Sequence, residues 1–525
     1  MQLTGSNFIG RRPSKSSNQF FVAKDPASGE DLEGAFAEAT EGEIDAAVSL
    51  AEEAFLKYQN TSNEARASFL EAIADEILAL GDVLVQRAMA ETSLPQGRIQ
   101  GERGRTMGQM KLFAKVVREG SWVDARVDPA MPDRDPMPRA DIRSMLQPLG
   151  PVTIFGASNF PLAFSVAGGD TASALASGCT VVIKGHPAHP STSELVFQAI
   201  LKAAEKTGMP DGVASLIHGT THEVGGLLVK HPLIQAVGFT GSFGGGKALF
   251  DLANKRPQPI PVFSEMGSTN PVFILPGAMR ERGEQIAAGL AGSVTLGVGQ
   301  FCTNPGLVVL PDGPVEEFKS KLSEEIAGNG GGTMLTSGIK AAYEKGAKKV
   351  GDTTDVTSIA EGKVASTDAG VQAKVFLTKS GALKAYDYLS EEVFGPSTLL
   401  VESSQKSELI DIAKELKGHL TATIHGTDED LEAYKDLLQI LTRKVGRIVI
   451  NGFPTGVEVC HAMVHGGPYP STTNSQSTSV GTAAIKRFAR PVCYQDLPDS
   501  LLPDALKAAN PNKIWRLVDG AFRKD

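Results

Sequence analysis

Cys302 is the first candidate for chemistry in this sequence. It lies in GVGQFCTNPG, where glycine, glutamine, asparagine and proline give the composition of a loop. A thiol on a loop can face a substrate, whereas an isolated cysteine often serves only as a small buried apolar residue. A free thiol has a pKa of about 8.5, so a small fraction is thiolate at neutral pH. Covalent catalysis by Cys302 is therefore a hypothesis that this residue alone does not establish.

Two other polar side chains follow predicted strands. Glu265, in VFSEMGSTNP, comes directly after an apolar strand, and Asn159, in FGASNFP, lies on the turn after VTIF. Carboxyl ends of strands in open α/β sheets border ligand clefts, and the amide of Asn159 could stabilise an oxyanion. The alternatives are that Glu265 caps a helix or faces solvent, and that Asn159 bonds only to its own backbone.

A glycine-rich turn, GFTGSFGGG from Gly238 to Gly246, follows an apolar strand and opens a predicted helix. Such turns expose backbone N–H groups and a positive helix end to phosphate. The turn matches neither G-x-G-x-x-G nor the P-loop pattern, so alone it is a weak signal for a dinucleotide or phosphate site.

The histidine spacings do not favour a metal site. His461 and His465 are four residues apart, the spacing of a helical zinc pair. However, CHAMVH lacks the glutamate of HExxH and runs directly into Gly-Gly-Pro, which is poor helix. His186 and His189 are three residues apart, and no third ligand suggests itself. We therefore expect no metal.

Alternating strands and helices must position these residues. From residue 152 onward, short apolar runs alternate with helical segments, as βαβ units of a parallel sheet do. The first set of runs is VTIF, TVVIK, VASLIHG, QAVGF and PIPVFSE, and the second set, which starts near residue 270, is PVFIL, GLVVL, KVFLT, STLLV and RIVING. Two successive α/β layers predict two domains with a cleft between them.

The first third of the chain is predicted to be helical. Helix-capping spacing occurs at Thr40–Glu43, Thr61–Glu64 and, further on, Ser191–Glu194. Residues 120–150 are rich in proline and mixed charge, which favours an extended arm over a central strand. The glycine run at 328–332 is expected to be a flexible loop.

The length, composition and net charge of the chain limit the classes of protein to which it can belong. A chain of 525 residues is long enough for two or three domains, and its net charge of −9 argues against a nucleic-acid partner. Four cysteines make no disulfide framework and fit a reducing compartment. Residues 151–183 are apolar, but their glycines indicate a buried strand, turn, helix and strand rather than a membrane span. Without an apolar signal segment, we expect a soluble, cytoplasmic protein.

A set of motifs resembles the aldehyde dehydrogenase superfamily over nearly the whole chain. DPASGE at residues 25–30 is similar to the family's NPxTGE, SNFP to its NFP turn, VVIK to its cofactor strand and GFTGS to its nucleotide turn. SEMGSTNP is similar to the general-base motif ELGGxxP, GQFC to the nucleophile motif GQxC and EEVFGP to the ribose-binding motif EExFGP. The motifs occur in family order. The resemblance implies an α/β fold with a Rossmann-like cofactor domain, an α/β catalytic domain and a small β oligomerisation arm.

The resemblance implies a role for each matching residue. Cys302 would attack the aldehyde carbonyl, and the Asn159 amide and the Cys302 backbone N–H would hold the oxyanion. Hydride would pass from the thiohemiacetal to a nicotinamide, and Glu265 would activate the water that hydrolyses the thioester. Phe160, beside Asn159, is expected on the substrate side. The residues implied for the cofactor are Lys184 at the adenosine ribose, Gly241, Ser242 and Gly246 at the pyrophosphate, and Glu392 and Phe394 at the nicotinamide ribose and ring.

The segment after the cofactor strand departs from the pattern of NAD-preferring relatives. These commonly place a glutamate there that binds the adenosine ribose and repels a 2′-phosphate, whereas this chain has Lys184 followed by GHPAHP. Loss of that carboxylate lowers the electrostatic penalty for NADP, and Lys184 with His186 would add attraction. We therefore expect NADP, or both NADP and NAD, rather than strict use of NAD.

A second departure lies near the expected substrate tunnel. His465, in AMVHGGPYP, takes the place of an aromatic residue, where a substrate-side role, a proton relay or a structural hydrogen bond all fit. This segment, GASNFPLAFSVAGGD and GFTGSFGGG look most like the branch that oxidises α-ketoglutaric semialdehyde (2,5-dioxopentanoate) to 2-oxoglutarate. They also resemble the NADP-dependent fatty aldehyde dehydrogenase of luminous bacteria. The first substrate needs a cationic or polar anchor and the second an apolar tunnel; we expect the first.

Two hypotheses from other classes explain less of the sequence. A Cys–His acyl hydrolase that uses Cys302 and His465 leaves GFTGS and EEVFGP without a role. A protein that keeps the fold only for binding or structure leaves the nucleophile, the base and the oxyanion donor without a role.

The resemblance also implies domain boundaries and an oligomer. The expected segments are 1–125 and 151–268 for the cofactor domain, 269–460 for the catalytic domain, 126–150 and 478–498 for the arm, 461–477 for a substrate-side loop and 499–525 for a carboxyl-terminal extension. The arm is expected to join copies of the chain into a homodimer or homotetramer.

Overall fold

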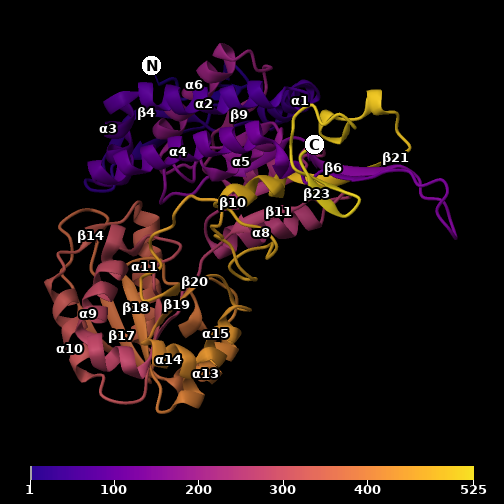
Figure 1. Ribbon diagram of the computed structural model, residues 1–525. Helices are drawn as coiled ribbons and strands as arrows, with labels where there is room; N and C mark the ends of the chain where they lie inside the picture. The colour runs from indigo at the N-terminus through magenta and orange to yellow at the C-terminus, as the bar shows by residue number, and fades with distance from the viewer. Residues whose placement is uncertain (1–2) are drawn as a thin grey trace.

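In residues 3–525, which the computed structural model describes, the chain forms two α/β lobes and a β-sheet arm (Figure 1). The sheet of the first lobe has the order β11-β10-β7-β8-β9-β1-β2. Strands β7 to β11 are parallel, and β1 and β2 extend the sheet beyond β9 as antiparallel edge strands. The bounds are Asn7–Ile9 (β1), Arg12–Ser14 (β2), Val152–Phe155 (β7), Val181–Lys184 (β8), Ala214–Ile217 (β9), Ala236–Thr240 (β10) and Val262–Glu265 (β11).

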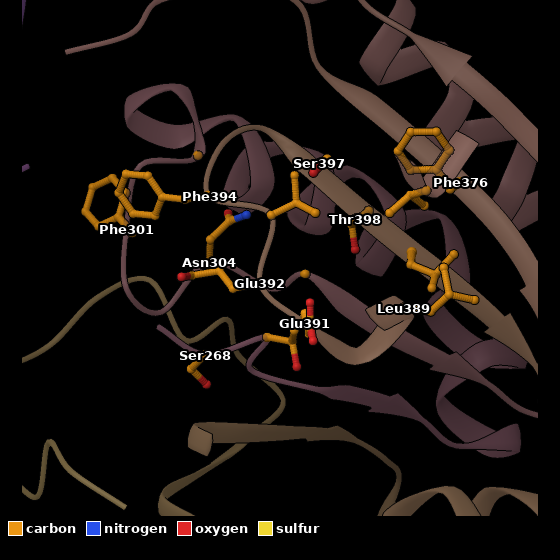
Figure 2. Close-up of a pocket in the computed structure, with 16 residues that line it drawn as sticks. Ser268, Phe301, Asn304, Phe376, Leu389, Glu391, Glu392, Phe394, Ser397 and Thr398 are labelled. Atoms are coloured by element: carbon orange, nitrogen blue, oxygen red, sulfur yellow. The ribbon is translucent and has the colours of Figure 1, made fainter. Parts of the chain in front are cut away.

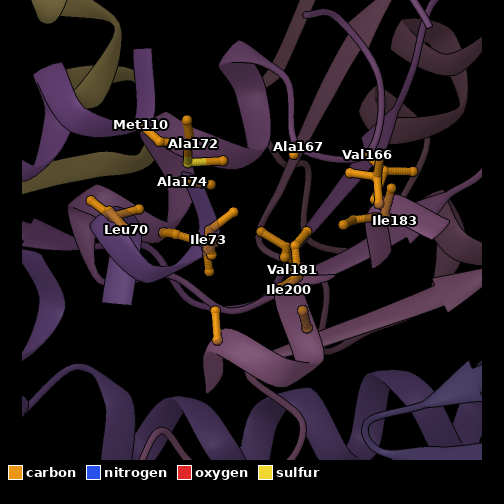
Figure 3. Close-up of a cluster of buried hydrophobic side chains, with 14 of the residues drawn as sticks. Leu70, Ile73, Met110, Val166, Ala167, Ala172, Ala174, Val181, Ile183 and Ile200 are labelled. Carbon is orange, nitrogen blue, oxygen red and sulfur yellow. The ribbon is translucent and has the colours of Figure 1, made fainter. Parts of the chain in front are cut away.

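The strands of the first sheet are apolar throughout because helices cover both faces. Val181 and Ile183 pack against α2, α4, α5 and α6, whereas Val182 faces α1, α7 and α8. Figure 3 shows Leu70 and Ile73 of α2 in the first of these clusters. Burying such a side chain contributes about 1.5–3 kcal/mol. The bounds are Glu41–Tyr58 (α1), Asn63–Ala79 (α2), Gly81–Thr92 (α3), Gln96–Glu119 (α4), Gly169–Ser177 (α5), Pro190–Lys206 (α6), His222–Lys230 (α7) and Phe243–Asn254 (α8).

The second lobe is another sheet covered on both faces, in the order β15-β17-β18-β13-β12-β19-β20. Its neighbouring strands are parallel except for β15 and β17. Helices α9 and α10 cover one face, and α11, α13 and α15 cover the other. The strand bounds are Val272–Ile274 (β12), Leu307–Leu310 (β13), Thr357–Glu361 (β15), Lys374–Lys379 (β17), Ser397–Glu402 (β18), His419–His425 (β19) and Val445–Ile450 (β20).

The helices of the second lobe separate most of these strands along the chain, so the predicted alternation of strands and helices is confirmed. Their bounds are Pro276–Thr295 (α9), Glu316–Gly328 (α10), Ser337–Gly351 (α11), Ser380–Ala385 (α12), Lys406–Glu415 (α13), Asp428–Ala433 (α14) and Lys435–Leu441 (α15). A hairpin of β3 (Phe20–Lys24) and β4 (Asp31–Ala37) belongs to the amino-terminal part of the chain.

The arm is a sheet in the order β21-β6-β5-β22-β23. Its bounds are Arg126–Asp128 (β5), Ile142–Pro148 (β6), Ala489–Gln495 (β21), Arg516–Val518 (β22) and Ala521–Arg523 (β23). The sequence set residues 499–525 apart as an extension, but β22 pairs with β5 and β23 with β22 in this same sheet. Leu502, Leu506 and Ile514 are buried against Val127, so burial of their apolar side chains holds the end of the chain to the arm.

Local differences from the sequence prediction have simple causes. The capping box at Thr40 is present, but α2 begins one residue later than predicted, with the Ser62 hydroxyl accepting the N–H of Ala65. Helix α6 begins at Pro190, a residue favoured at the first helical position, while Glu194 accepts the backbone N–H groups of residues 4 and 5. The glycine run ends in β14 (Gly332–Thr333), which pairs with β16 (Gly370–Val371).

Residues 151–183 form buried β7, α5 and β8, as the sequence predicted. Within residues 3–525, no helix is both long enough and apolar enough to span a membrane.

Candidate active site

The nucleophile loop joins α9 of the second lobe to β13 and carries Cys302. Gly299 has φ +65° and lies so close to Gly395 that a side chain at this position would overlap the backbone there. Asn270 Nδ2 donates to the carbonyl oxygens of Cys302 (2.9 Å) and Asn304 (3.0 Å) and so fixes the loop from beneath. Sequence reasoning did not single out Asn270, although an asparagine before a proline in the base motif suits its φ of +46°.

Three side chains from separate segments converge beside this loop. Glu265 is the last residue of β11, and its Oε1 lies 2.8 Å from His465 Nε2. The same nitrogen lies 3.4 Å from Cys302 Sγ. One ligand-type atom from each side chain lies within 4.8 Å of the others, so these residue types could also hold a metal ion. The short contacts equally define a path for a proton between sulfur and carboxylate.

The two histidine pairs that were considered for a metal and disfavoured do not meet at this site. His461 is exposed, with Nδ1 3.2 Å from Thr482 Oγ1, so it does not join His465. His186 and His189 stack on each other, with ring centroids 5.4 Å apart, and His189 lies 3.1 Å from the Ala157 carbonyl oxygen. His465 instead contacts the carboxylate of Glu265 and the thiol of Cys302. Its spacing from His461 in the sequence could not indicate these contacts.

The segment around His465 is tied to the base strand. The His465 N–H donates to Thr478 Oγ1 (2.9 Å), and the Ser479 N–H donates to the His465 carbonyl oxygen (2.8 Å). Met266, the residue after Glu265, donates its N–H to the Ser471 carbonyl oxygen (2.8 Å). Backbone pairing beside β11 therefore holds the imidazole against the carboxylate.

Glu265 is buried yet electrostatically suited to remain ionised. Burial alone would raise its pKa, but His465, a hydrogen bond donated by the Ser479 hydroxyl and the charge of Arg487 together lower it. Arg487 is itself fixed by Asp170, with Nη2 2.6 Å from Oδ1. A carboxylate with a lowered pKa is charged at neutral pH and can accept a proton.

The pKa of the Cys302 thiol is shifted in the opposite direction from that of Glu265. Burial raises its pKa well above the usual value, and the negative charges of Glu265 and Glu392 raise it further. The positive charge of Arg105 opposes this rise. The free enzyme therefore holds a neutral thiol at neutral pH, and the site must remove its proton during the reaction.

We predict that Cys302 of the cofactor-free enzyme reacts slowly with iodoacetamide at pH 7. Its rate constant should rise about tenfold per pH unit up to pH 9, because the thiolate fraction grows in that proportion below the pKa. Quantifying the modified Cys302 peptide by mass spectrometry measures the rate, and N-acetylcysteine is the reference thiol with an ordinary pKa. A plateau below pH 8 would contradict the raised pKa.

Asn159 lies on the turn after β7 and reaches the nucleophile loop from the first lobe. Its Nδ2 donates to the Gln300 carbonyl oxygen at 2.9 Å, and an amide nitrogen carries a second N–H that can face an oxyanion. Phe160 is buried in an aromatic cluster, with ring centroids 5.1 Å from Phe164 and 5.5 Å from Phe301. The two predicted residues are consecutive on this turn, and each contacts the nucleophile loop, Asn159 at Gln300 and Phe160 at Phe301.

Glu392 and Phe394 line a pocket beside the nucleophile loop, together with Ser268, Phe301 and Asn304 (Figure 2). Burial raises the pKa of Glu392 to about 7. Gly267 lies against Glu392, where any side chain at position 267 would overlap the carboxylate. The glycine in the base motif therefore makes room for the glutamate, and a carboxylate held in this way fits the hydroxyl groups of a ribose.

The three residues predicted to bind phosphate, on the turn from β10 to α8, differ in their exposure to solvent. Gly241 and Ser242 are exposed at the start of α8, where the Ser242 hydroxyl accepts the Gly245 N–H at 3.2 Å. Gly246 is buried, and a Cβ there would lie 2.7 Å from Met266. An accessible helix start fits a phosphate at Gly241 and Ser242. Gly246 instead gives close packing against the residue that follows the base.

Lys184 ends β8 and donates to the Gly219 carbonyl oxygen. Burial lowers its pKa to about 8, while Glu38 acts in the opposite direction. The pKa of His186 is well below its usual value because of burial and the charges of His189 and Lys184. Burial therefore favours the uncharged form of His186, and an attraction between His186 and a 2′-phosphate stays a prediction.

The class of protein follows from two features. Each of the two lobes has a mainly parallel sheet covered by helices, and the thiol of Cys302, the carboxylate of Glu265 and the amide of Asn159 come together from separate segments. The chain belongs to the aldehyde dehydrogenase family, whose model matches residues 13–490. The structure of betaine aldehyde dehydrogenase from Staphylococcus aureus in complex with NAD+ has a TM-score of 0.80 at 20% identity, covering 94% of this chain and 95% of that one. A 1-pyrroline-5-carboxylate dehydrogenase structure has a TM-score of 0.78 at 20% identity, covering 94% and 92%. Both share the fold.

Two relatives are similar over most of their length. The chain is 52% identical over 522 residues to alpha-ketoglutaric semialdehyde dehydrogenase 2 of Azospirillum brasilense, covering 99% of each chain. It is 48% identical over 492 residues to alpha-ketoglutaric semialdehyde dehydrogenase of Acinetobacter baylyi, covering 93% of each. The resemblance that the motifs indicated, to the family and to this branch of it, is confirmed.

Proposed function

We propose that this protein oxidises α-ketoglutaric semialdehyde to 2-oxoglutarate through a covalent intermediate on Cys302. The observation that carries the proposal is the convergence of Cys302, His465 and Glu265 beside the pocket that Glu392 lines. Membership of an aldehyde-oxidising family that uses NAD(P) supports the reaction, and the names of the two relatives support the substrate.

The reaction begins with removal of the thiol proton. His465 Nε2 contacts both Cys302 Sγ and the ionised Glu265. With its hydrogen on Nδ1, the neutral imidazole accepts the thiol proton at Nε2, and the new Nε2–H donates to Glu265. The sulfur then bonds to the aldehyde carbon, and the new oxyanion accepts an N–H from Asn159 in a thiohemiacetal. Oxidation to the thioester needs the hydride acceptor that a bound nicotinamide supplies.

Hydrolysis of the thioester uses the same carboxylate. Glu265 takes a proton from water while the water oxygen bonds to the acyl carbon, and the C–S bond then breaks. The acid product leaves, and Cys302 regains its proton through His465. The hydroxyl of Ser479 holds the second oxygen of Glu265, which keeps the carboxylate aimed at the nucleophile.

The cofactor residues are proposed from the same fit. Glu392 and Phe394 would hold the nicotinamide ribose and ring, because both line the pocket next to Cys302. Gly241 and Ser242 would hold the pyrophosphate at the start of α8, and Lys184 would hold the adenosine ribose or a 2′-phosphate. We propose that NADP is preferred, since no acidic residue follows Lys184 in GHPAHP.

The cofactor preference gives a direct prediction. NADP is expected to exceed NAD in kcat/KM by roughly fivefold, the ratio that about 1 kcal/mol of partly screened attraction to Lys184 supplies. Initial rates with both cofactors at saturating aldehyde measure the ratio, and Lys184→Met should remove the preference. A strong preference for NAD in the wild-type enzyme would contradict it.

The substrate is tested by a panel of aldehydes followed through absorbance of the reduced cofactor. The panel contains α-ketoglutaric semialdehyde, succinic semialdehyde, glutaraldehyde and long-chain alkanals. The highest kcat/KM is expected for α-ketoglutaric semialdehyde. A higher value for the alkanals would instead favour a fatty aldehyde dehydrogenase, for which the apolar cluster of Phe160, Phe164 and Phe301 is the supporting observation.

A Cys–His acyl hydrolase also draws support from one contact, the 3.4 Å between Cys302 Sγ and His465 Nε2. That activity has no use for the Glu392 pocket and no need of a cofactor. Product formation from an aldehyde only when NAD(P) is present supports the dehydrogenase. Hydrolysis of an activated ester at the same rate with and without cofactor, and no aldehyde oxidation, would support the hydrolase.

We also propose the domain and assembly arrangement that the resemblance implies, with β22 and β23 added to the arm. Strand β21 lies at one edge of the arm sheet, and unpaired edges of sheets favour pairing with another chain. A homodimer or homotetramer built through the arm follows. The cysteines at 179, 302, 460 and 493, all within the described residues, are free, which supports our placement of the enzyme in the cytoplasm.

A further inference from the structure

Two arginines of α4 lie over the aromatic cluster beside the nucleophile. The guanidinium carbon of Arg98 is 4.3 Å from the ring centroid of Phe160 and 4.8 Å from that of Phe301. The guanidinium carbon of Arg105 is 5.8 Å from the centroid of Phe160 and 5.1 Å from that of Phe164. A spacing of seven residues places the two on one face of the helix. Phe301 precedes Cys302 in the chain, and the ring centroid of Phe164 lies 6.4 Å from that of His465, so both arginines lie near the candidate active site.

The two arginines differ in their partners. Arg98 is matched by Glu102, with Nε 3.4 Å from Oε2, and its Nη2 lies 3.5 Å from the Asn159 carbonyl oxygen. Arg105 has no ion pair among residues 3–525, and its Nε and Nη2 are buried with no hydrogen-bond partner there. A buried guanidinium without an acceptor costs stability unless an anion completes it.

The nearby carboxylates are already engaged. Glu102 Oε1 accepts the N–H groups of Leu162 (2.8 Å) and Ala163 (2.9 Å), and its Oε2 faces Arg98. Glu265 contacts His465 and Ser479. Burial lowers the pKa of Arg105, while Cys302 in its thiolate form, Glu102 and Glu265 raise it in part. Arg105 thus lies within electrostatic reach of the reaction centre, and no carboxylate of residues 3–525 forms an ion pair with it.

We propose that Arg105 binds the distal carboxylate of the substrate and so selects a semialdehyde that carries an acid group, an inference that rests on the proposed function. A guanidinium can donate two parallel N–H groups to a carboxylate. The rings of Phe160 and Phe164 then pack against the methylene groups between the two ends. Four C–C bonds of about 1.5 Å separate the aldehyde and carboxylate carbons of α-ketoglutaric semialdehyde, a span of about 5 Å.

The test compares α-ketoglutaric semialdehyde with pentanal, which has the same five-carbon chain and no charge. In Arg105→Met, kcat/KM for the semialdehyde should fall about 100-fold more than kcat/KM for pentanal, mainly through KM. An equal fall in kcat/KM for both aldehydes would come from the effect of Arg105 on the Cys302 thiol. The ratio of the two kcat/KM values therefore measures only the binding of the distal carboxylate. Arg103→Met, which removes an equal charge from a side chain that bonds the Gly81 carbonyl oxygen, should leave the ratio unchanged.

A second measurement separates this inference from the proposed function. Calorimetric titration with 2-oxoglutarate should show binding to the wild-type enzyme and a loss of at least about tenfold in affinity in Arg105→Met. If no aldehyde is oxidised, the proposed function fails. The titration then still shows whether Arg105 binds a carboxylate, because it does not depend on turnover. Equal affinity in both proteins, or an equal loss of kcat/KM for the two aldehydes, would overturn the anchor.

A conservative variant covers the case in which Arg105→Met does not fold. Arg105→Lys keeps the charge but loses the paired N–H groups, so kcat/KM for the semialdehyde should fall about tenfold while that for pentanal is retained. Thermal unfolding of each variant checks that the protein is folded. Full retention of the wild-type ratio in Arg105→Lys together with loss of folding in Arg105→Met would assign Arg105 to structure and overturn the proposal.

Discussion

Replacing Cys302 with alanine is expected to lower kcat for aldehyde oxidation by about 10⁴-fold or more, the scale on which other enzymes slow when a covalent nucleophile is removed. Without the sulfur no thiohemiacetal forms, so the carbon that must release hydride never reaches the tetrahedral state. Asn159 and Glu265 remain in place, but neither can form the covalent bond. Steady-state assays with α-ketoglutaric semialdehyde and each cofactor measure the loss.

The matched control is Cys460→Ala, which removes a half-buried thiol outside the convergence of Cys302, His465 and Glu265. This variant should keep wild-type kcat. Cys302→Ser should be almost as inactive as Cys302→Ala, because a hydroxyl is far harder to ionise than a thiol. Aldehyde oxidation at the wild-type rate in either Cys302 variant would remove Cys302 from the mechanism.

Replacing Glu265 with glutamine is expected to separate the two halves of the reaction. The first turnover should still produce reduced cofactor as a burst, while hydrolysis of the thioester slows by about 10²–10³-fold, within the range that a general base contributes. Glutamine keeps the size of the side chain but cannot take the proton from water. Stopped-flow absorbance of the reduced cofactor measures the burst and the steady rate in one trace.

The burst amplitude is the internal control for an intact site, because it counts the subunits that complete acylation. His465 loses its carboxylate partner in Glu265→Gln, so some slowing of the burst itself is also expected. Unchanged steady-state turnover, in an enzyme shown to be limited by hydrolysis, would contradict the role of Glu265 as the base. Loss of the burst with an unchanged fold would place Glu265 in acylation alone.

The sequence allowed prediction of the fold and of the residues on which the chemistry depends. Short apolar runs between helices indicate a parallel sheet, and both sheets are present. Glu265, Asn159 and Cys302 follow strands or lie on a glycine-rich loop, and the fold brings them together from separate segments. Their motifs were informative because each combines a turn with a reactive group.

Other features depend on contacts between distant segments, and the sequence either left them among several alternatives or did not indicate them. The approach of His465 to both Cys302 and Glu265 requires the pairing of its loop with β11. Arg105 lies on a helix whose charged residues resemble a solvated face until Phe160 and Phe164 are packed beside it. Local composition describes a segment, whereas the partners of a buried charge are set by the tertiary structure.

Gly246 and His186 show the same limit in the other direction. A glycine-rich turn suggests phosphate at every glycine, but packing against Met266 uses Gly246 for close approach. A histidine near a predicted phosphate suggests positive charge, but burial beside Lys184 lowers the pKa of His186 and favours its neutral form. The end of the chain was similarly ambiguous, because its short apolar runs become strands only when β5 provides an edge.

The most direct test of the mechanism is the intact mass of Glu265→Gln quenched in acid soon after mixing with α-ketoglutaric semialdehyde and NAD(P). We expect a protein heavier by one 2-oxoglutaryl group, with the added mass on the peptide that contains Cys302 and removable by hydroxylamine. An unmodified protein after a full burst of reduced cofactor, or an acyl group on any other residue, would contradict it.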